Sequence, residues 1–477
     1  MMKWILILVA TTFLSLDGKS QNENNHWFFG LNAGLDFNSG SPQINNVSPL
    51  RAAESSSSIS DSLGNLIFYT NGGGYPHFGG VWDRNHNLMP NGDLNPPPPT
   101  TWLSCNSAQM GTVIVPDPGN ENEYYIFAAD CYESGGGLQP MTFHKVDMSL
   151  NSGFGDVTLI HQPIPNVGPG MSWNGEAMVA VSHSNGEDYW VVYNNPWTDA
   201  YHSILVSDTG VANNVSSIAY TNSSTFYTGQ MNISPTGDKL CYCTESEVYL
   251  VDFDRSTGLV SNAELIDINN ARPTGCAFSR SGEKLYVNFE QLNGPACGGG
   301  GVISNLMYQY DLSSGSIQDN YIDFFCANLN ETFGTMQIGP DDKIYMARKT
   351  MDSLGIINNP ETLGVGCDFN PNGLFLDTMC YLGLPNFVVK LPAISTVDLE
   401  SVTQSKYQIF PNPFTEEIKV SGNGNGELVT IEVRDIYGNI VLRNSFSDIE
   451  VELSLGNLAN GVYYIYIDDI AYKVLKQ

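Results

Sequence analysis

Residues 231–266 constrain the fold most, because their pattern recurs along most of the chain. They read as four short strands, Met231–Ser234, Leu240–Thr244, Glu247–Asp252 and one near Ala263–Ile266. A turn at Pro235–Asp238 separates the first two, since proline presets one φ angle and glycine supplies another. Strands this short cannot bury a face alone, so we expect one antiparallel sheet packed on neighbouring copies.

The first hairpin of this unit recurs five further times. The turns of these copies, each leading into an apolar strand, are Ser60–Gly64, Pro116–Gly119, Ser182–Gly186, Ser279–Glu283 and Gly339–Asp342. A seventh copy forms if the ends are joined, because Trp27–Phe29 and Leu35–Phe37 lack a first strand that Leu384–Val388 can supply. Closing a ring removes exposed sheet edges. The sequence therefore predicts a seven-bladed β-propeller, with six blades and a separate N-terminal strand pair as the alternative.

The composition suits a turn-rich, all-β protein. Charged residues make up 15% of the chain, against about 25% in an average domain, while glycine occurs 47 times and tyrosine 24 times. The net charge of −30 is spread along the chain, which argues against nucleic-acid binding, since that needs basic patches. An acidic extracellular surface explains the charge more simply than a specific cationic partner.

Residues 1–20 have the pattern of a secretory signal peptide. Lys3 supplies the positive start, and Trp4–Leu16 is an apolar run too short to span a bilayer. Gly18 and Ser20 are small residues before a cut that leaves Gln21 first. No cysteine follows the cut, so a lipid anchor is not expected, and we predict no transmembrane segment after signal removal.

Nine cysteines fit an oxidising compartment, and their odd number leaves at least one unpaired or paired between chains. Two disulfides are expected, Cys105–Cys131 and Cys367–Cys380, because each pair brackets a loop. Cys241 and Cys243 lie two apart on one strand and so point to the same face. A structural zinc site needs four ligands at suitable spacing, and the sequence shows no such set of four. Disulfides or buried thiols are the favoured interpretation.

The composition changes after Val389. Residues 391–406 are polar and lack the repeat, which predicts a linker between a propeller of residues 21–390 and a C-terminal domain of residues 407–477. About six short strands separated by turn residues fill that domain. They predict a small immunoglobulin-like β-sandwich.

The C-terminal domain resembles the type IX secretion C-terminal sorting domain, by which Bacteroidota export proteins across the outer membrane. The motifs that carry the resemblance are Phe410–Phe414, Asp435–Gly438, Leu458–Tyr463 and Lys473–Gln477. The resemblance implies a sorting signal that includes Pro411, Asn412, Pro413, Asp435, Gly438, Gly461, Lys473 and Lys476. It further implies passage through the periplasm, contact with the secretion machinery and removal of the tail. The protein is then expected attached to the cell surface or released.

The preceding body is similar to β-propeller regions of large surface proteins from the same bacteria. The likeness spans roughly residues 26–390, opens on Trp27–Gly30 with Ala33–Phe37, and closes on Gly383–Phe387. It implies no known reaction.

One face of the predicted ring is expected to bind a ligand. Alternate connections of an up-and-down blade lie on opposite faces, and those between second and third strands are expanded at residues 71–80, 130–140, 194–202 and 290–304. The blade-to-blade loops, such as residues 163–173, are expected on the same face. Such a scaffold can display a binding surface. The aromatic candidates on this face are Tyr75, His77, Trp173, Trp197 and Tyr201. Their rings suit sugars or peptides, although packing against their own loops explains them equally well.

The sequence gives little support for catalysis, and we predict no catalytic residue. Ser60–Gly64 approaches the Asp-box of sialidases, but no arginine triad accompanies it, and no Gly-x-Ser-x-Gly elbow marks a hydrolase. The seven histidines are scattered singly. Asp83–Asn87 places oxygen atoms as calcium loops do, but a polar turn is the favoured interpretation. We expect no cofactor, with a structural calcium ion left open.

Together these features predict a secreted or surface-attached propeller that binds polysaccharide or protein. Two alternatives stay open: a propeller-type carbohydrate-active enzyme, either a glycosidase or a lyase, and a purely structural adhesion component.

Overall fold

The computed structural model describes most of the chain, which folds as two compact units, residues 1–394 and 395–477. The described ranges are 22–74, 77–95, 106–131, 141–165, 175–195, 200–218, 228–268, 271–292, 303–313, 321–327, 332–393, 407–422, 429–435, 439–446, 450–467 and 470–477. Within them, no helix has the length and apolar character needed to cross a membrane.

In its described residues, the first unit contains six sheets that are each built on four consecutive antiparallel strands, as the repeat predicts, and one three-stranded sheet at its N-terminal end. One of the six has a fifth strand from the end of the unit. The six are β4 (Ser57–Ser60), β5 (Leu66–Thr70), β6 (Gly80–Asp83) and β7 (Leu88–Asp93); β8 (Thr112–Pro116), β9 (Glu123–Ala128), β10 (Thr142–Asp147) and β11 (Asp156–Pro163); β12 (Met178–Ser182), β13 (Tyr189–Asn195), β14 (Ala200–Ser207) and β15 (Gly210–Ile218); β16 (Thr228–Ile233), β17 (Lys239–Thr244), β18 (Glu247–Asp254) and β19 (Leu259–Ile268); β20 (Arg272–Phe278), β21 (Lys284–Leu292), β22 (Ile303–Asp311) and β23 (Tyr321–Ala327); β24 (Phe333–Ile338), β25 (Ile344–Arg348), β26 (Ser353–Ile357) and β27 (Phe369–Phe375). The three-stranded sheet is β1 (His26–Phe29), β2 (Ala33–Asp36) and β3 (Gln43–Ile44).

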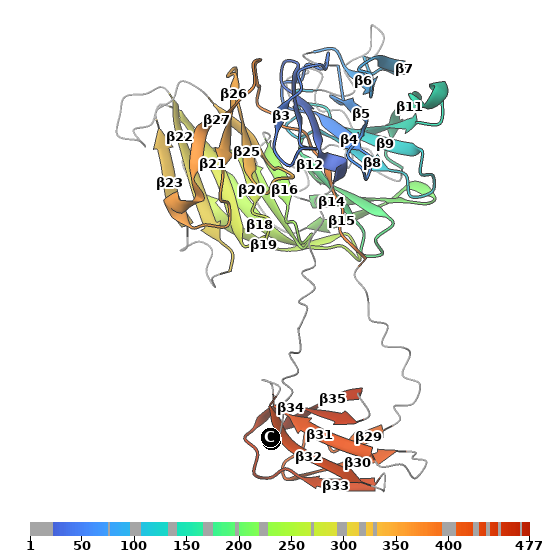
Figure 1. Cartoon of the computed structure of the whole chain (residues 1–477), viewed down its shortest axis with the longest axis vertical. Helices are drawn as coiled ribbons and strands as arrows, with labels where there is room; N and C mark the ends of the chain where they lie inside the picture. Colours follow the sequence, from blue (N-terminus) through green and yellow to red (C-terminus); the bar gives the residue numbers. More distant parts are fainter. Residues whose placement is uncertain are drawn as a thin grey trace, which may run out of the picture. The chain divides into compact units, whose positions relative to one another are not determined.

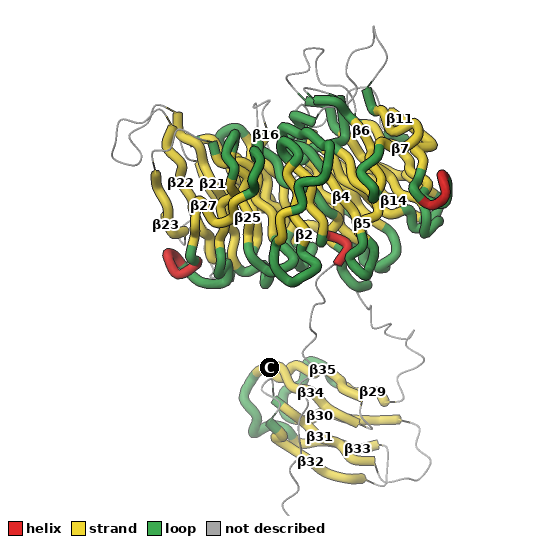
Figure 2. The backbone as a smooth tube through the Cα atoms, turned by 45° about the horizontal axis from the view of Figure 1, so that its top comes forward, coloured by secondary structure: helices red, strands yellow, loops and turns green. Residues whose placement is uncertain are grey.

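Consecutive sheets face one another around a common centre (Figures 1 and 2). The first strands β4, β8, β12, β16, β20 and β24 contact one another in this order, and β1 contacts β4. Apolar clusters fill the spaces between sheets, and one of them joins Trp27 and Phe29 of β1 to Tyr345 of β25. Radially arranged four-stranded meanders of this kind form a β-propeller.

The two ends of the first unit meet, but not by the predicted strand pairing. Leu31 N donates to Met379 O at 3.0 Å, and the rings of Trp27 and Phe387 lie 5.9 Å apart. The expected ladder between Leu384–Val388 and β1 is absent from the described pairings. Instead β28 (Val388–Val389) pairs in parallel with β12. Pro385 has no N–H to donate, which disfavours a regular central strand at this position.

The segment that follows Leu382 lies among the inner strands of four sheets. Leu384 N donates to Thr335 Oγ1 at 2.8 Å, and Asn386 Nδ2 donates to Met178 O at 2.9 Å and Met110 O at 3.4 Å. The main chain of Asn386 also bonds to Ser56 O and, in a parallel bridge, faces Ser57. This segment therefore ties the inner strands together from the centre.

The predicted disulfide between Cys367 and Cys380 is wrong, because both are free thiols. Cys367 ends the short helix η4 (Gly364–Cys367) and packs with Tyr286 and Met307. Cys380 packs with Trp27 and Leu384 in a different apolar cluster. The intervening chain thus carries the two residues to separate cores. The pairing of Cys131 with Cys105 stays a prediction, since Cys105 lies outside the described residues.

The second unit consists of two antiparallel sheets packed on one core. The strands are β29 (Tyr407–Phe410), β30 (Glu417–Gly422), β31 (Val429–Arg434), β32 (Ile440–Phe446), β33 (Glu450–Ser454), β34 (Gly461–Ile467) and β35 (Ile470–Lys476). Their order is β29-β30-β33 in one sheet and β32-β31-β34-β35 in the other. Tyr407, Ile418, Val433 and Ile465 are among the buried residues between them. Six of the seven strands correspond to the predicted ones, and β29 is additional.

Candidate functional site

Hydrogen bonds join the opening motif of the C-terminal unit, Phe410–Phe414, to its closing motif, Lys473–Gln477. Asn412 donates through Nδ2 to Lys473 O at 3.0 Å and accepts at Oδ1 from Leu475 N at 2.9 Å. Phe414 N donates to Leu475 O, and Gln477 N to Phe414 O, both at 2.9 Å. The opening motif is therefore fastened along the outer edge of β35, where it covers a row of backbone groups that would otherwise be unpaired.

The two lysines of the closing motif have different environments. Lys476 is buried, its ammonium group donates to Thr415 O, and it lies 5.6 Å from the centre of the Phe414 ring. Lys473 is exposed, as are Pro411 and Pro413 beside it on the same edge. Lys476 thus holds the motif in place, whereas Lys473 and the two prolines are accessible to a partner.

Asp435 of the predicted sorting signal has a local structural role. It accepts from Asn439 N and Asn439 Nδ2, each at 2.9 Å, and so closes the β31–β32 turn. Asp61 makes the same pair of bonds to Asn65 in the first unit, also at 2.9 Å. The Asp-x-x-Gly-Asn pattern is therefore a turn motif that recurs in this chain. Gly438 lies outside the described residues, and Gly461 begins β34.

The predicted ligand-binding residues of the first unit fall into three groups. Tyr75, Trp173 and Trp197 lie outside the described residues. His77 is half-buried, and burial followed by the charge of Arg51 lowers its pKa. Tyr201 is fully buried between two sheets, with its ring 6.1 Å from that of Tyr242. The predicted ligand contact of Tyr201 does not fit this position, because its ring belongs to the core.

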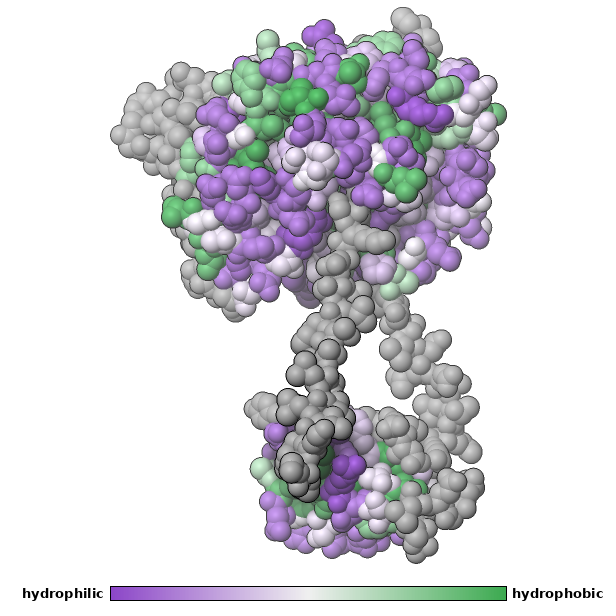
Figure 3. All heavy atoms as spheres, in the orientation of Figure 1, coloured by the Kyte–Doolittle hydropathy of each residue, from purple (hydrophilic) through white to green (hydrophobic). Residues whose placement is uncertain are grey.

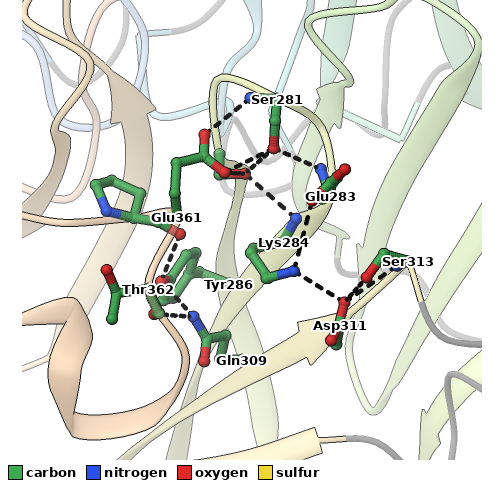
Figure 4. Close-up of polar contacts among 11 residues, drawn as sticks. Ser281, Glu283, Lys284, Tyr286, Gln309, Asp311, Ser313, Glu361 and Thr362 are labelled. Atoms are coloured by element: carbon green, nitrogen blue, oxygen red, sulfur yellow. Dashed lines mark hydrogen bonds and ion pairs between the residues drawn. The ribbon is translucent and has the colours of Figure 1, made fainter.

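On the opposite face, polar side chains satisfy one another across neighbouring sheets (Figure 4). Glu361 accepts from Ser281 N at 2.9 Å, Ser281 Oγ at 2.6 Å and Ser279 Oγ at 3.0 Å. Lys284 Nζ bonds Asp311 Oδ1 at 2.9 Å nearby. Because these groups already have partners, the cluster connects the β20–β23 sheet to the β24–β27 sheet and does not resemble a vacant ligand site.

We expect the substitution Glu361→Gln to lower the free energy of unfolding at pH 7 by about 1 kcal/mol, given the exposure of this side chain. Burial alone would raise the pKa of Glu361, but hydrogen bonds from Ser281 and Ser279 outweigh it and lower the pKa below the usual 4.5. The stability that the ionised Glu361 carboxylate contributes is therefore complete above pH 4.5, and it is lost as the pH falls through the lower pKa of the folded protein. Urea unfolding at pH 7 and at pH 3 measures it.

The control is Glu283→Gln, which neutralises an exposed carboxylate 3.9 Å from Lys284 in the same turn. It should change stability little at either pH. A Glu361→Gln deficit that is equally large at pH 3 would contradict the role of the ionised carboxylate.

The Asp83–Asn87 segment forms the polar turn that the sequence favours. Asp83 is buried and accepts at Oδ1 from Asn85 N at 2.8 Å and Asn87 N at 3.0 Å. Two backbone N–H groups therefore close the turn on one oxygen of the Asp83 carboxylate.

One group of side chains in the described residues has metal-binding chemistry: Cys241, Cys243 and Cys276, whose sulfur atoms lie within 4.8 Å of one another. The sequence pattern identifies the first two as neighbours on one face of β17. It does not bring in Cys276, because that residue comes from β20 of the next sheet.

Polar residues cover most of the visible surface of the first unit, with apolar ones scattered among them (Figure 3). The exposed large apolar residues include Val47 after β3, Leu63 in the β4–β5 turn and Phe375 at the end of β27, which belong to three different sheets. Scattered apolar residues of this kind do not mark a docking site.

Residues 408–477 match a family model described as the secretion system C-terminal sorting domain. The match covers the whole second unit apart from its first residues, and it includes every motif described above. A type IX sorting tail implies export to the cell surface or the extracellular space, so the chain has the features of a cargo protein of that system.

No curated protein matches the sequence. Solved structures similar to the chain include hydrazine synthase of Kuenenia stuttgartiensis (13% identity, 73% of this chain and 79% of that chain, TM-score 0.36). A second is Hsv2 of Kluyveromyces lactis (9% identity, 70% of this chain and 90% of that chain, TM-score 0.41). A third is the β-propeller domain of Myceliophteria thermophila Cps50 (Swd1) (10% identity, 70% of this chain and 95% of that chain, TM-score 0.40). These TM-scores are too low to support an argument, so the fold rests on the sheet order and contacts above.

Proposed function

We propose that this chain is a seven-bladed propeller protein of Bacteroidota that binds an extracellular polysaccharide or protein. The match of residues 408–477 to a sorting domain carries the proposal, since a type IX sorting tail implies export to the cell surface or the extracellular space. In this proposal residues 1–20 are a signal peptide, residues 391–406 a linker, and the secretion machinery is the first partner. The immunoglobulin-like sandwich is the form in which the tail meets that machinery.

The three-stranded sheet supports the blade count. It contacts β4 on one side through β1, and on the other it shares a core with β25 and β26. In this proposal it is the seventh blade, between the β24–β27 sheet and the β4–β7 sheet. The central segment near Phe387 stands where its inner strand would be, without the hydrogen bonds of a ladder.

The difference between the two faces supports a binding role. Connections such as residues 94–111, 129–141 and 164–177 all leave the same ends of their strands, because the sheets share one antiparallel order. Most described turns at the other ends are shorter, and in the longer connection of residues 358–368 Glu361 is bonded to Ser279 and Ser281 of the neighbouring sheet. Elaboration of one face on a rigid scaffold is typical of binding proteins.

We expect the purified chain to bind at least one class of glycan on an array, or an extracellular protein. The substitutions Trp173→Ala and Trp197→Ala should each weaken that binding by about tenfold or more, since tryptophan commonly dominates such contacts. Affinity is measured by calorimetry on the ligand that the screen identifies.

The matched control is Tyr201→Phe, which alters a buried aromatic ring in the core and should leave affinity unchanged. Incubating the ligand with the protein and examining it for products separates binding from the enzymatic alternative. Product formation would overturn the binding proposal. Failure to bind any glycan or protein would favour a purely structural role.

A further inference from the structure

Three cysteine side chains converge between the β16–β19 and β20–β23 sheets. Cys241 and Cys243 come from β17, and Cys276 comes from β20. All three are fully buried free thiols, and their sulfur atoms all lie within 4.8 Å of one another. Apolar residues such as Val248, Leu285 and Phe289 pack around them.

The backbone that presents the Cys276 sulfur is held by a buried glutamine, Gln230. Gln230 Oε1 accepts from Cys276 N at 3.1 Å and from Met336 N at 2.8 Å, while its Nε2 donates to Met336 O at 2.7 Å. The Cys276 thiol lies 3.6 Å from Gln230 O and 3.8 Å from Cys241 O. The inner strands β16, β20 and β24 are thus fixed relative to one another, which sets the position of the Cys276 sulfur before any ligand binds.

The dimensions of the cluster fit a metal ion at its centre. Simple geometry puts the centre of such a triangle no more than about 2.8 Å from each sulfur, and small side-chain rotations give the metal–sulfur distance of about 2.3 Å that is usual for thiolates. Among the described residues, no fourth histidine, cysteine, aspartate or glutamate joins the three. Zinc in structural sites takes four ligands, whereas soft copper(I) is selected by sulfur and is satisfied by three.

The thiols also interact with one another. Burial alone would raise the pKa of Cys243, but hydrogen bonds from Cys241 and Cys276 outweigh burial and lower it. Burial raises the pKa of the other two thiols. The three sulfur atoms therefore face one another across the two sheets, as a shared ligand requires.

We propose that Cys241, Cys243 and Cys276 bind one copper(I) ion in a buried three-sulfur site. Each sulfur that binds as a thiolate releases its proton when the ion enters. Since the site is closed to solvent, the ion enters while the two sheets assemble. The bound ion would also keep three adjacent thiols from oxidation in a compartment where disulfides form. This site is independent of the binding face proposed above.

The test uses the full-length chain produced in cells grown with added copper and purified under reducing conditions. We expect about one copper per chain by mass spectrometry and a thiolate-to-copper absorption band in the near ultraviolet. The substitution Cys276→Ser should remove both. The matched control Cys380→Ser changes a buried free thiol in another cluster and should keep both.

X-ray absorption at the copper edge of the unmodified chain provides a test that requires no variant. Three sulfur neighbours support the site. Four outcomes would each overturn the proposed copper site: protein without copper, copper retained in Cys276→Ser, zinc in place of copper, or a disulfide joining Cys276 to Cys241 or Cys243.

Discussion

We expect deletion of residues 407–477 to leave a folded body that stays in the periplasm and is missing from the cell surface and the medium. The deleted residues have their own core, formed by residues such as Ile418, Val433 and Ile465, and form a separate compact unit. Their loss therefore removes the sorting domain without exposing the core of the body. Immunoblots of periplasmic, surface and medium fractions measure the distribution.

A point variant refines this prediction. Asn412→Ala removes both side-chain bonds that fasten the opening motif to β35, so export should fall while the body folds normally. The matched control is Asp61→Ala, which disturbs a turn in the body that has the same geometry as the Asp435 turn and should leave export unchanged. Full export of the chain lacking residues 407–477 would contradict the sorting role.

The repeat predicts the sheets well because each unit is local. Turns such as Pro235–Asp238 and the alternating residues of Glu247–Asp252 lie within a few residues of one another, and they fix hairpins without any distant contact. The structure has strands at every predicted copy. The tail motifs are recognisable for a similar reason, since an ordered set of turns and short strands defines that domain.

Contacts between distant segments are harder to infer. Leu384–Val388 has the apolar pattern of a strand, and the sequence correctly indicates that it returns to Trp27. Its hydrogen-bond partner depends on Pro385 and on the position of Asn386 among four sheets, which no local pattern encodes. The same holds for Cys276, whose distance from Cys241 depends on how two sheets pack, and for Tyr201, which faces a neighbouring sheet.

Replacement of Trp27 by alanine should lower the free energy of unfolding of the body by about 3–5 kcal/mol, the usual loss for a large aromatic residue removed from a core. Trp27 is fully buried, and its ring lies 5.0 Å from Phe37, 5.5 Å from Tyr345 and 5.9 Å from Phe387. It therefore connects β1, β25 and the central segment at the point where the ends of the body meet. Chemical denaturation gives the change.

The control for Trp27→Ala is Phe78→Ala, because Phe78 is 49% exposed and its removal should cost less than about 0.5 kcal/mol. If Trp27→Ala does not fold, Trp27→Phe keeps an aromatic ring and makes the loss measurable. Combining the Trp27 and Phe387 substitutions should cost less than their sum, because the two rings share one contact. Additive losses would show that the central segment is held without the N-terminal strand, and the ring would then be open at this point.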